Sequence, residues 1–276
     1  MDISTGEFAT AQFKDRESLE SEMMRYAPAE VIIPEGNENV ENWMKALGIN
    51  VTPCKEDTWL YPVSKKALEE RFGSVEELNT YPMAVTAAGA VLSYATDTQF
   101  SELPHLRPPS LMVKAKTMTL DAVTLRNLEI VRTIGGSSKD TLFAVLNKSS
   151  TAGGSRRLKD WLLRPLHDLD RINERHDAVQ ELFDNTLSRR EIRDILKGFL
   201  DVERLLSRLG HGSVSPRDLD SLKNSLNTVK DLKQFLSEEP LKSKLMKKLV
   251  KSIDIHKQVS KKLEEAIVEE PPLVIR

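Results

Sequence analysis

Two neighbouring stretches, LDAVTLRNLEI at residues 120–130 and TAGGSRRLKDWLLRPL at residues 151–166, carry the strongest structural signals of this chain. In the first, Asp121 sets a turn after a short extended segment, and an apolar run of leucine and isoleucine follows. The second contains the start and stop signals of a helix. No other part of the sequence is as dense in such signals.

The helix expected within residues 151–166 has defined ends. Thr151 or Ser155 can cap its N-terminus, because a side-chain oxygen there accepts a hydrogen bond from a free backbone N–H. Pro165 stops the helix at about Leu163, since proline cannot continue the pattern of backbone hydrogen bonds. The sequence therefore predicts one short, well-bounded helix directly after the turn-rich stretch.

Length and composition are those of a globular chain with many surface helices. The 276 residues predict about one to two domains, and the chain is 39% hydrophobic, 30% charged and 5% aromatic. No apolar run approaches the roughly 20 residues that span a bilayer, and the N-terminus lacks a basic segment followed by an apolar one. We expect an intracellular protein. Cys54 is the only cysteine, which excludes an internal disulfide and favours a buried structural thiol.

Charge is divided unevenly along the chain. Up to His105 there are 8 Lys and Arg against 18 Asp and Glu, a net charge of −10, and the remainder has 32 against 24, a net charge of +8. An acidic surface suits a protein partner better than a polyanion, because each phosphate contact needs a neutralising cation. The basic part is compatible with lying near DNA, but charges of alternating sign along solvated helices explain most of it.

Strand and helix signals alternate in the first hundred residues, which predicts an α/β layer arrangement with a partly parallel sheet. Gly48 and Gly73 are expected to end two of the helices, and Ser64 to cap the second of these. His105 lies in the segment Ser101–Ser110, whose prolines indicate a linker. The expected strands are at 3–8, 31–33, 51 and 59–63, and the expected helices at 18–26, 40–47, 64–72 and 83–94.

Helical spacing continues almost without interruption beyond this linker. Ser215 and Pro216 are expected to begin a long helix, and Pro240 to break the chain before the next. Its apolar stripe is narrow, so these helices should pack on one another in a bundle. The two clearest stripes are Leu169, Ile172, His176, Val179 and Leu182, where His176 is expected in the core, and Leu219, Leu222, Leu226, Val229, Leu232 and Leu236.

The stretches at residues 120–130 and 151–166 resemble the opening of the core, or lever, domain of the MutS family of DNA mismatch repair proteins. The resemblance extends over almost the whole chain, in the order that the family has. One departure is Gly153, where the family pattern has a larger residue, often Met. The further matching stretches are DISTGEF at 2–8, PAEVIIP at 28–34, AAGAVLSY at 87–94, TQ at 98–99, LPHL at 103–106, RHDAV at 175–179, DVERL at 201–205 and PRDL at 216–219.

The resemblance implies a fold that is α/β and then all-α. Residues 1–105 would form an RNase H-like connector domain, slightly truncated at its N-terminus, and residues 106–276 part of the helical core or lever bundle. Both ends of the sequence are those expected of a fragment. Its implied function is to couple the recognition of mismatched DNA to the state of an ATPase in the longer protein, and to offer a surface to a MutL-like partner.

No enzymatic activity is expected of this fragment itself. A phosphate-binding loop needs Gly-Lys-Ser/Thr, and no glycine in this chain is followed by lysine. The resemblance places ATP and Mg²⁺ in a C-terminal domain of the parent, which would be a DNA-dependent ATPase. The implied partners are a MutL-like protein, a second MutS-like subunit and mismatched double-stranded DNA, with no membrane. A prokaryotic source would make the protein cytoplasmic and nucleoid-associated.

Two sets of residues are candidate functional sites. The first is expected to act in joint packing rather than in ligand contact, with Trp161 and Leu162 burying one side of their helix: Asn127, Glu129, Gly154, Arg156, Trp161 and Pro165. Arg156 at a helix start could attract a phosphate, but carboxylates or carbonyls of a neighbouring element are its favoured partners. The second is a basic cluster that could approach the DNA backbone, although a solvated face is favoured: Lys244, Lys247, Lys248 and Lys251.

Two other classes of function stay open. A free-standing helical adaptor would have a reading frame that stops where this chain stops. An RNase H-like nuclease would hold two metal ions with clustered carboxylates, for which Asp2, Glu7 and Asp97 are the candidates. In a regular strand Asp2 and Glu7 point to opposite sides and cannot share a site, so catalytic, cofactor and metal sites are not expected in this chain.

Overall fold

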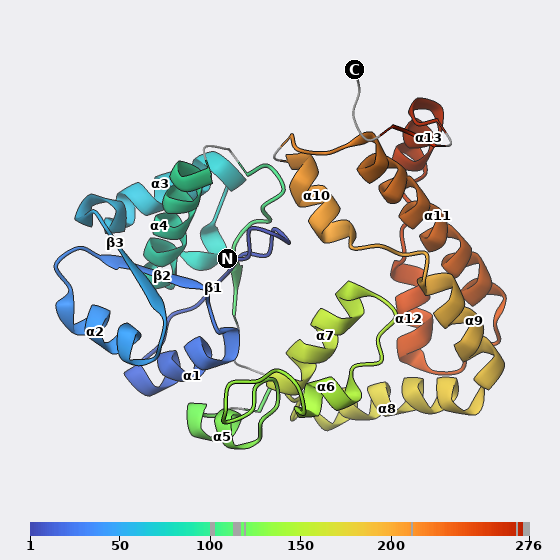
Figure 1. Cartoon of the computed structure of the whole chain (residues 1–276), viewed down its shortest axis with the longest axis horizontal. Helices are drawn as coiled ribbons and strands as arrows, with labels where there is room; N and C mark the ends of the chain where they lie inside the picture. The colour runs from blue at the N-terminus through green and yellow to red at the C-terminus, as the bar shows by residue number, and fades with distance from the viewer. Residues whose placement is uncertain (100–102, 113–116, 119, 211, 269, 273–276) are drawn as a thin grey trace. The chain divides into compact units, whose positions relative to one another are not determined.

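A computed structural model describes residues 1–99, 103–112, 117–118, 120–210, 212–268 and 270–272 (Figure 1). The chain divides into two compact units, which we describe separately. Unit 1 comprises Met1–Ala115 and Leu120–Asn127, and unit 2 comprises Lys116–Thr119 and Leu128–Arg276. The chain therefore passes from one unit to the other three times, and the segment Leu120–Asn127 belongs to unit 1 although both of its flanks belong to unit 2.

Unit 1 has the predicted α/β character, with short parallel strands. In the pair β2 and β3, Val31 lies opposite Val51, and in the pair β1 and β4, Ala9 lies opposite Ser110. The helix α2 makes the crossover between β2 and β3, as a parallel pair requires. The elements are β1(Ala9–Thr10), α1(Arg16–Tyr26), β2(Glu30–Pro34), α2(Glu38–Ala46), β3(Asn50–Cys54), η1(Glu56–Trp59), α3(Tyr61–Phe72), η2(Glu76–Leu78), α4(Pro82–Gln99), β4(Ser110–Leu111) and α5(Ala122–Asn127).

The core of unit 1 lies between α3 and α4. Leu68 and Val85 are fully buried there, together with alanines of α4 that allow a close approach. Gly89 of α4 touches the backbone of α3, because a Cβ at this position would lie 2.4 Å from Ser64 Cα. The hydroxyl of Thr10 on β1 donates to the carbonyl of Ala84 over 2.7 Å. Small residues at the contact thus set how closely the two helices pack.

The expectation of a strand at residues 3–8 is wrong. The backbone N–H of Asp2 donates to the carbonyl of Glu7 over 2.7 Å, which closes a tight turn, and Gly6 lies in the left-handed region at φ 71°. The Asp2 carboxylate accepts from the N–H of Ser4 over 2.8 Å and so stabilises the turn. The argument from strand parity that separated Asp2 from Glu7 therefore does not apply to this segment.

The extended segment expected at Trp59–Val63 is also replaced by helix. Trp59 ends η1, and α3 begins at Tyr61 with Pro62 in its first turn, a position that proline favours. Ser64 is therefore not a cap. It lies inside α3, buried, and its hydroxyl donates to the carbonyls of Thr58 and Thr86 over 3.1 and 3.2 Å.

The proline-rich segment expected to be a linker is packed onto unit 1. Its first two residues lie outside the described part of the chain, but Leu103 and Leu106 are buried in the core of unit 1. The segment then runs alongside the N-terminal turn, where the N–H of Arg107 donates to the carbonyl of Gly6 over 3.0 Å, and ends in β4. Its prolines prevent a helix, as expected, but buried leucines fix the backbone.

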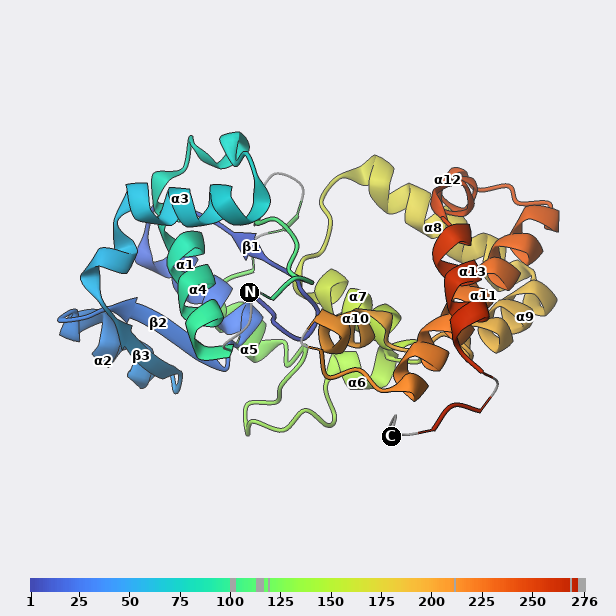
Figure 2. The same cartoon turned by 90° about the horizontal axis from the view of Figure 1, so that it is seen from above.

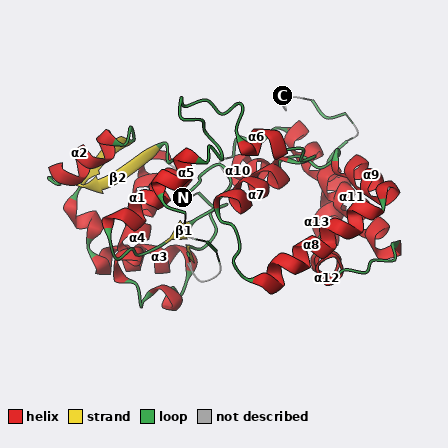
Figure 3. Ribbon diagram, turned by 90° about the horizontal axis from the view of Figure 1, so that it is seen from below, coloured by secondary structure: helices red, strands yellow, loops and turns green. Residues whose placement is uncertain are grey.

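Unit 2 is built from helices, as predicted, and Figure 3 shows the strands in unit 1 and the helical character of unit 2. Its longest helix, α11, starts with the predicted cap: Ser215 and Asp218 form reciprocal hydrogen bonds, and Pro216 occupies the first turn. The elements are α6(Leu142–Leu146), α7(Ala152–Leu163), α8(Leu169–Asp184), α9(Thr186–Leu196), α10(Val202–Gly210), α11(Pro216–Glu238), α12(Lys244–Ser252) and α13(Lys257–Ala266).

The helix α11 packs against both α9 and α13, which Figure 2 shows on either side of it. A cluster of Ala178, Leu236 and Met246 joins α8, α11 and α12. The expectation of a core histidine is wrong, because His176 is exposed on α8, as is Val179. The buried side of α8 is the one that carries Ala178 and, partly buried, Leu182. No described helix is both long enough and apolar enough to cross a membrane.

Candidate functional site

The predicted helix start at Thr151 forms as expected. Thr151 is the N-cap of α7, and its hydroxyl oxygen accepts from the N–H of Gly154 over 3.0 Å. The side-chain amide of Asn147 donates to the hydroxyl of Ser155 over 2.8 Å. A Cβ on Gly154 would lie 3.0 Å from the Thr151 hydroxyl oxygen, whereas a Cβ on Gly153 would meet nothing within 4 Å. The first turn of α7 is therefore tightly fixed at Gly154 and open at Gly153.

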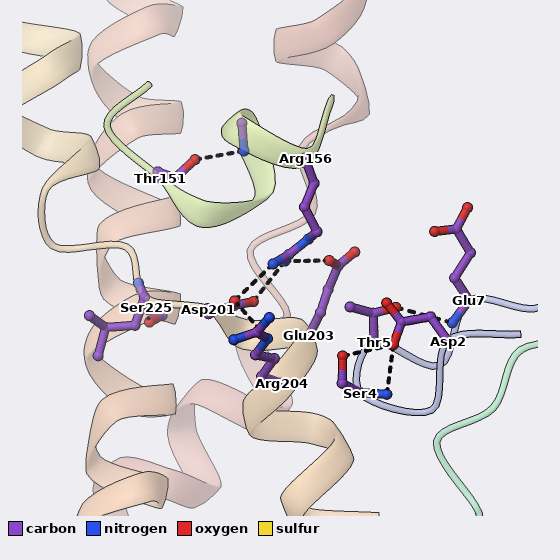
Figure 4. A network of polar contacts seen from close by, with 12 residues as sticks. Asp2, Ser4, Thr5, Glu7, Thr151, Arg156, Asp201, Glu203, Arg204 and Ser225 are labelled. Carbon is purple, nitrogen blue, oxygen red and sulfur yellow. Dashed lines mark hydrogen bonds and ion pairs between the residues drawn. The ribbon is translucent and has the colours of Figure 1, made fainter. Parts of the chain in front are cut away.

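Arg156, in the second turn of α7, binds two carboxylates at the start of α10 (Figure 4). Its Nη1 and Nη2 donate to the two oxygens of Asp201 over 2.9 and 2.7 Å, and Nη2 also donates to Glu203 over 2.6 Å. This planar, bidentate arrangement is one that arginine makes and lysine cannot. Arg204 adds a longer contact to Asp201, at 3.6 Å. We call Arg156, Asp201, Glu203 and Arg204 the α7–α10 joint.

The charges of the joint stabilise one another. The guanidinium of Arg156 holds the pKa of Asp201 below its usual value, and the hydrogen bond to Asp201 raises the pKa of Arg156. Asp201 and Glu203 also lie at the N-terminus of α10, where negative charge is favourable. All three ion-paired side chains remain partly exposed, so the network fixes geometry more than it adds stability.

A second contact fixes the same segment from the other side. The N–H of Leu200 donates to the hydroxyl of Ser225 over 3.1 Å, and Ser225 is fully buried within α11. Residues 200–203 are thus tied to α7 through the contacts of Arg156, which Figure 4 shows, and to α11 through the bond from Leu200 to Ser225. Sequence reasoning missed Ser225, because a serine on a leucine-rich helix carries no signal of its own.

The other end of α7 has its own set of contacts. The guanidinium carbon of Arg175 lies 3.8 Å from the centre of the Trp161 ring, a cation–π contact. Trp161 stays exposed and Leu162 is only half-buried, so the expectation that they bury one side of the helix is wrong; Leu163 is the buried residue. The carbonyl of Pro165 accepts from the N–H of Met118 over 2.7 Å.

The remaining residues of the predicted joint set lie elsewhere. Glu129 adopts a left-handed backbone conformation, at φ 46°, and its carboxylate accepts from the N–H of Ile134 over 2.6 Å. Its carbonyl accepts from the N–H of Leu142, so it supports the start of α6. Asn127 is exposed at the last residue of α5, in unit 1. The six residues therefore do not form one joint: Gly154 and Arg156 lie at the start of α7, Trp161 and Pro165 near its end, Glu129 beside α6, and Asn127 at the end of α5.

The four lysines of the basic cluster are exposed along α12. Within the described residues, none of their ammonium groups pairs with a carboxylate. Lys251 also lines an open hollow at the turn between α12 and α13, together with Lys233, His256 and Lys257. The Nζ of Lys233 already donates to the carbonyl of Ile253 over 2.5 Å. This face is basic and accessible, and the positions of its charges are set by α11, α12 and α13.

The acidic residues considered for a metal site form no cluster in the described part of the chain, where no three His, Cys, Asp or Glu side chains come together in a geometry that could hold an ion. Cys54 is half-buried at the end of β3, and burial raises the pKa of its thiol. The best-defined site of this molecule is therefore the ion-paired joint of unit 2, in a chain that joins an α/β unit to a helical one.

Comparison with known families agrees with this two-part organisation. Residues 1–107 match the model of MutS domain II, and residues 123–276 match the model of MutS domain III. The two matches follow one another along the chain, with domain II before domain III. The joint, with Arg156, Asp201 and Glu203, lies within the second match.

Whole-chain relatives lead to the same family. Over its whole length, this chain is 35% identical to the DNA mismatch repair protein MutS of Methanococcoides burtonii. The match covers 33% of that relative. The chain is 37% identical to the protein of the same name from Pelotomaculum thermopropionicum, with 100% of this chain and 33% of the relative covered. This chain belongs to the MutS family, and it spans about a third of the length of the curated relatives it matches.

Proposed function

We propose that this chain is the connector and lever portion of a protein that recognises mismatched DNA, and that it couples DNA binding to the nucleotide state of an ATPase. The observation that supports this most is the consecutive match to MutS domains II and III. In this proposal residues 1–105 are the connector, with an RNase H-like sheet, and residues 106–276 are part of the lever. The coupling is allosteric, because DNA binding at one site and nucleotide binding at a distant site both act on the same set of packed helices.

The α7–α10 joint is the element that we assign to this coupling. A lever transmits movement only when its helices keep their mutual geometry, and the bidentate contact of Arg156 with Asp201 fixes α7 against the start of α10. Because the network is partly exposed, it fixes this geometry without adding much to the stability of the unit.

We further propose that the partners of the longer protein are mismatched double-stranded DNA, a second MutS-like subunit and a MutL-like protein. ATP and Mg²⁺ would bind in a domain outside this chain. The acidic residues of the first unit, with a net charge of −10 up to His105, are the surface offered to the MutL-like partner. Such a protein works inside the cell, in the cytoplasm with the nucleoid if the source is prokaryotic.

The lysines of α12 are a secondary candidate for contact with the DNA backbone. Their exposed, unpaired ammonium groups would release counterions from DNA, so binding by this face would weaken steeply with salt. Replacing Lys244, Lys247, Lys248 and Lys251 by Gln should lower the salt dependence of binding to a DNA duplex, whereas replacing the ion-paired Lys65 and Lys66 of α3 should not. Equal effects of the two sets would remove the lysines from the proposal.

The coupling is tested in the protein encoded by the whole reading frame, which we expect to contain a Gly-Lys-Ser/Thr loop. The readout is the ratio of ATPase rates with mismatched and with fully paired duplex. Arg156→Met should lower this ratio several-fold, while Lys197→Gln, which removes an exposed ion pair on the surface, should leave it unchanged. An unchanged ratio for Arg156→Met in a folded protein would end the assignment of the joint.

The two alternative classes of function, a free-standing helical adaptor and a metal-dependent nuclease, predict different experimental results. A reading frame that stops at Arg276 would favour the adaptor. Cleavage of DNA by the purified chain, dependent on Mg²⁺ or Mn²⁺ and lost in Asp2→Asn, would favour the nuclease.

A further inference from the structure

The segment Leu120–Asn127 packs on α1, and we call it the α5 strap. The Nη2 of Arg25, near the end of α1, donates to the carbonyl of Leu120 over 3.1 Å. Leu120 and Leu125 are both buried, while the outer face of α5, with Val123 and Asn127, is exposed. Two leucines and one arginine therefore hold the strap on unit 1.

Arg25 is itself held in place by a buried ion pair. Its guanidinium contacts the carboxylate of Glu22 one turn earlier on α1, and the two side chains are 6% and 11% exposed. A buried pair of this kind adds little stability over an apolar pair, but removing one partner leaves an uncompensated charge. It fixes the direction in which the guanidinium points, and here that direction is toward the backbone of the strap.

The strap has little structure to keep it folded without this contact. Asp121 caps it, since its carboxylate accepts from the N–H of Thr124 over 2.6 Å. However, α5 has only six residues, and helices much shorter than about 12 residues are marginal in water. A strap that leaves α1 should therefore unfold, which makes docking and local folding a single step.

Both flanks of the strap are fastened in unit 2. Before it, the N–H of Met118 donates to the carbonyl of Pro165, and Thr117 forms a bridge with Leu166. After it, the carbonyl of Ile130 accepts from the N–H of Phe143, at the start of α6, over 2.9 Å. Eight residues that are fixed on unit 1 thus lie between two backbone anchors of unit 2.

We propose that the α5 strap is a detachable coupling device, and that Arg25 is the residue that positions it. With the strap docked, a movement of α1 is passed along the backbone to both anchors of unit 2. With the strap released, the two units are joined by a longer and unstructured connection while each keeps its own core. Docking and release of the strap are properties of this chain alone. Only the purpose of the coupling, which is to link DNA binding to the nucleotide state, rests on the proposed function.

Hydrogen exchange and limited trypsin digestion of the whole chain test the docking. Arg25→Met should speed exchange of the strap amides, and cleavage after the exposed Arg126, by about tenfold or more, because a hydrogen bond from a charged group is lost and the buried Glu22 carboxylate is left uncompensated. Leu125→Ala should do the same without altering α1. The matched control is Arg16→Met on the same helix, whose guanidinium lies 4.1 Å from the Trp43 ring, and it should leave the strap protected.

Coupling is tested by the distribution of distances between spin labels on Lys66→Cys of α3 and Asp231→Cys of α11, both exposed positions, in a Cys54→Ser background. The distribution should broaden in Arg25→Met and not in Arg16→Met. The proposal would be overturned if the strap amides stayed protected in both Arg25→Met and Leu125→Ala. It would also be overturned if the amides of the strap and of α4 lost protection together, or if the distribution of label distances did not change. A chain that passes these tests while its longer protein shows no ATPase response to mismatches would refute the proposed function and not the strap.

Discussion

The helices α4 and α8 have similar lengths but very different surroundings. Seven of the eighteen residues of α4 are buried, whereas only Ala178 is buried among the sixteen of α8. The apolar residues of α8 point largely outward, with Val179 65% and Phe183 69% exposed. The difference shows that apolar spacing identifies a helix but does not say how much of its apolar face is buried: on α8 only Ala178 is buried, whereas the stripe of α11 does bury Leu222, Leu226 and Leu236.

The largest expected contrast comes from removing one large side chain in each unit. Leu68→Ala in α3 should cost about 3 kcal/mol, because it leaves a cavity in a fully buried site of unit 1. Phe183→Ala in α8 should change stability by less than about 0.5 kcal/mol. Urea unfolding, followed by Trp43 and Trp59 for unit 1 and by Trp161 for unit 2, measures both. A large cost for Phe183→Ala would show that this face of α8 is covered in solution.

The next effect concerns the close contact between α3 and α4. Gly89→Ala should destabilise unit 1 by about 2 to 3 kcal/mol, because the new methyl group would lie 2.4 Å from Ser64 Cα and the helices must separate. The fluorescence of Trp43 and Trp59 during urea unfolding reports the loss. Ser64→Ala is the control: it removes the hydroxyl bonds to Thr58 and Thr86 but keeps the spacing, so it should cost less. Equal costs would mean that the spacing is not what Gly89 provides.

Much of unit 2 could be predicted from its sequence, because its helix ends are set by local chemistry. Thr151, Asp168 and Ser215 each cap a helix with their own side chains, and Pro165 follows the end of α7. In contrast, Asp2–Glu7 forms a turn instead of the expected strand, because the Asp2 carboxylate accepts from the backbone of Ser4 and Gly6 adopts a left-handed conformation. Asp and Gly are turn residues, and the interpretation of this segment as a strand gave them too little weight.

The candidate site was predictable only in part. The position of Arg156 at the start of a helix could be read from sequence, but its partners Asp201 and Glu203 lie 45 and 47 residues away along the chain. Neither the contact with Asp201 nor the role of Ser225 follows from spacing, since both depend on how three helices pack. The exposed stripe of α8 has the same origin: periodicity says which residues share a face, and tertiary packing decides which face is covered.

A smaller effect, dependent on pH, is expected for the α7–α10 joint. Arg156→Met should destabilise unit 2 by about 1 kcal/mol at pH 7, a modest value because the network is partly exposed. The pKa of Asp201 is lowered in the folded protein, so its contribution is present above the unfolded pKa of about 3.9 and is lost as the pH falls through the lower folded value. Urea unfolding followed by Trp161 should show the difference between wild type and variant shrinking below about pH 4. A difference that grew on acidification would contradict the assigned pairing.

The smallest effect compares two neighbouring glycines at the start of α7. Gly153→Ala should stabilise unit 2 by about 0.5 to 1 kcal/mol, because alanine restricts the unfolded chain and its Cβ would meet nothing within 4 Å. Gly154→Ala restricts the unfolded chain in the same way, but its Cβ would lie 3.0 Å from the Thr151 hydroxyl oxygen that caps the helix. The gain in stability should therefore vanish or become a loss. Thermal unfolding monitored by Trp161 separates the two variants. If both were stabilising, the cap would tolerate the methyl group, and the first turn of α7 would be less tightly fixed than the bond from Gly154 to Thr151 indicates.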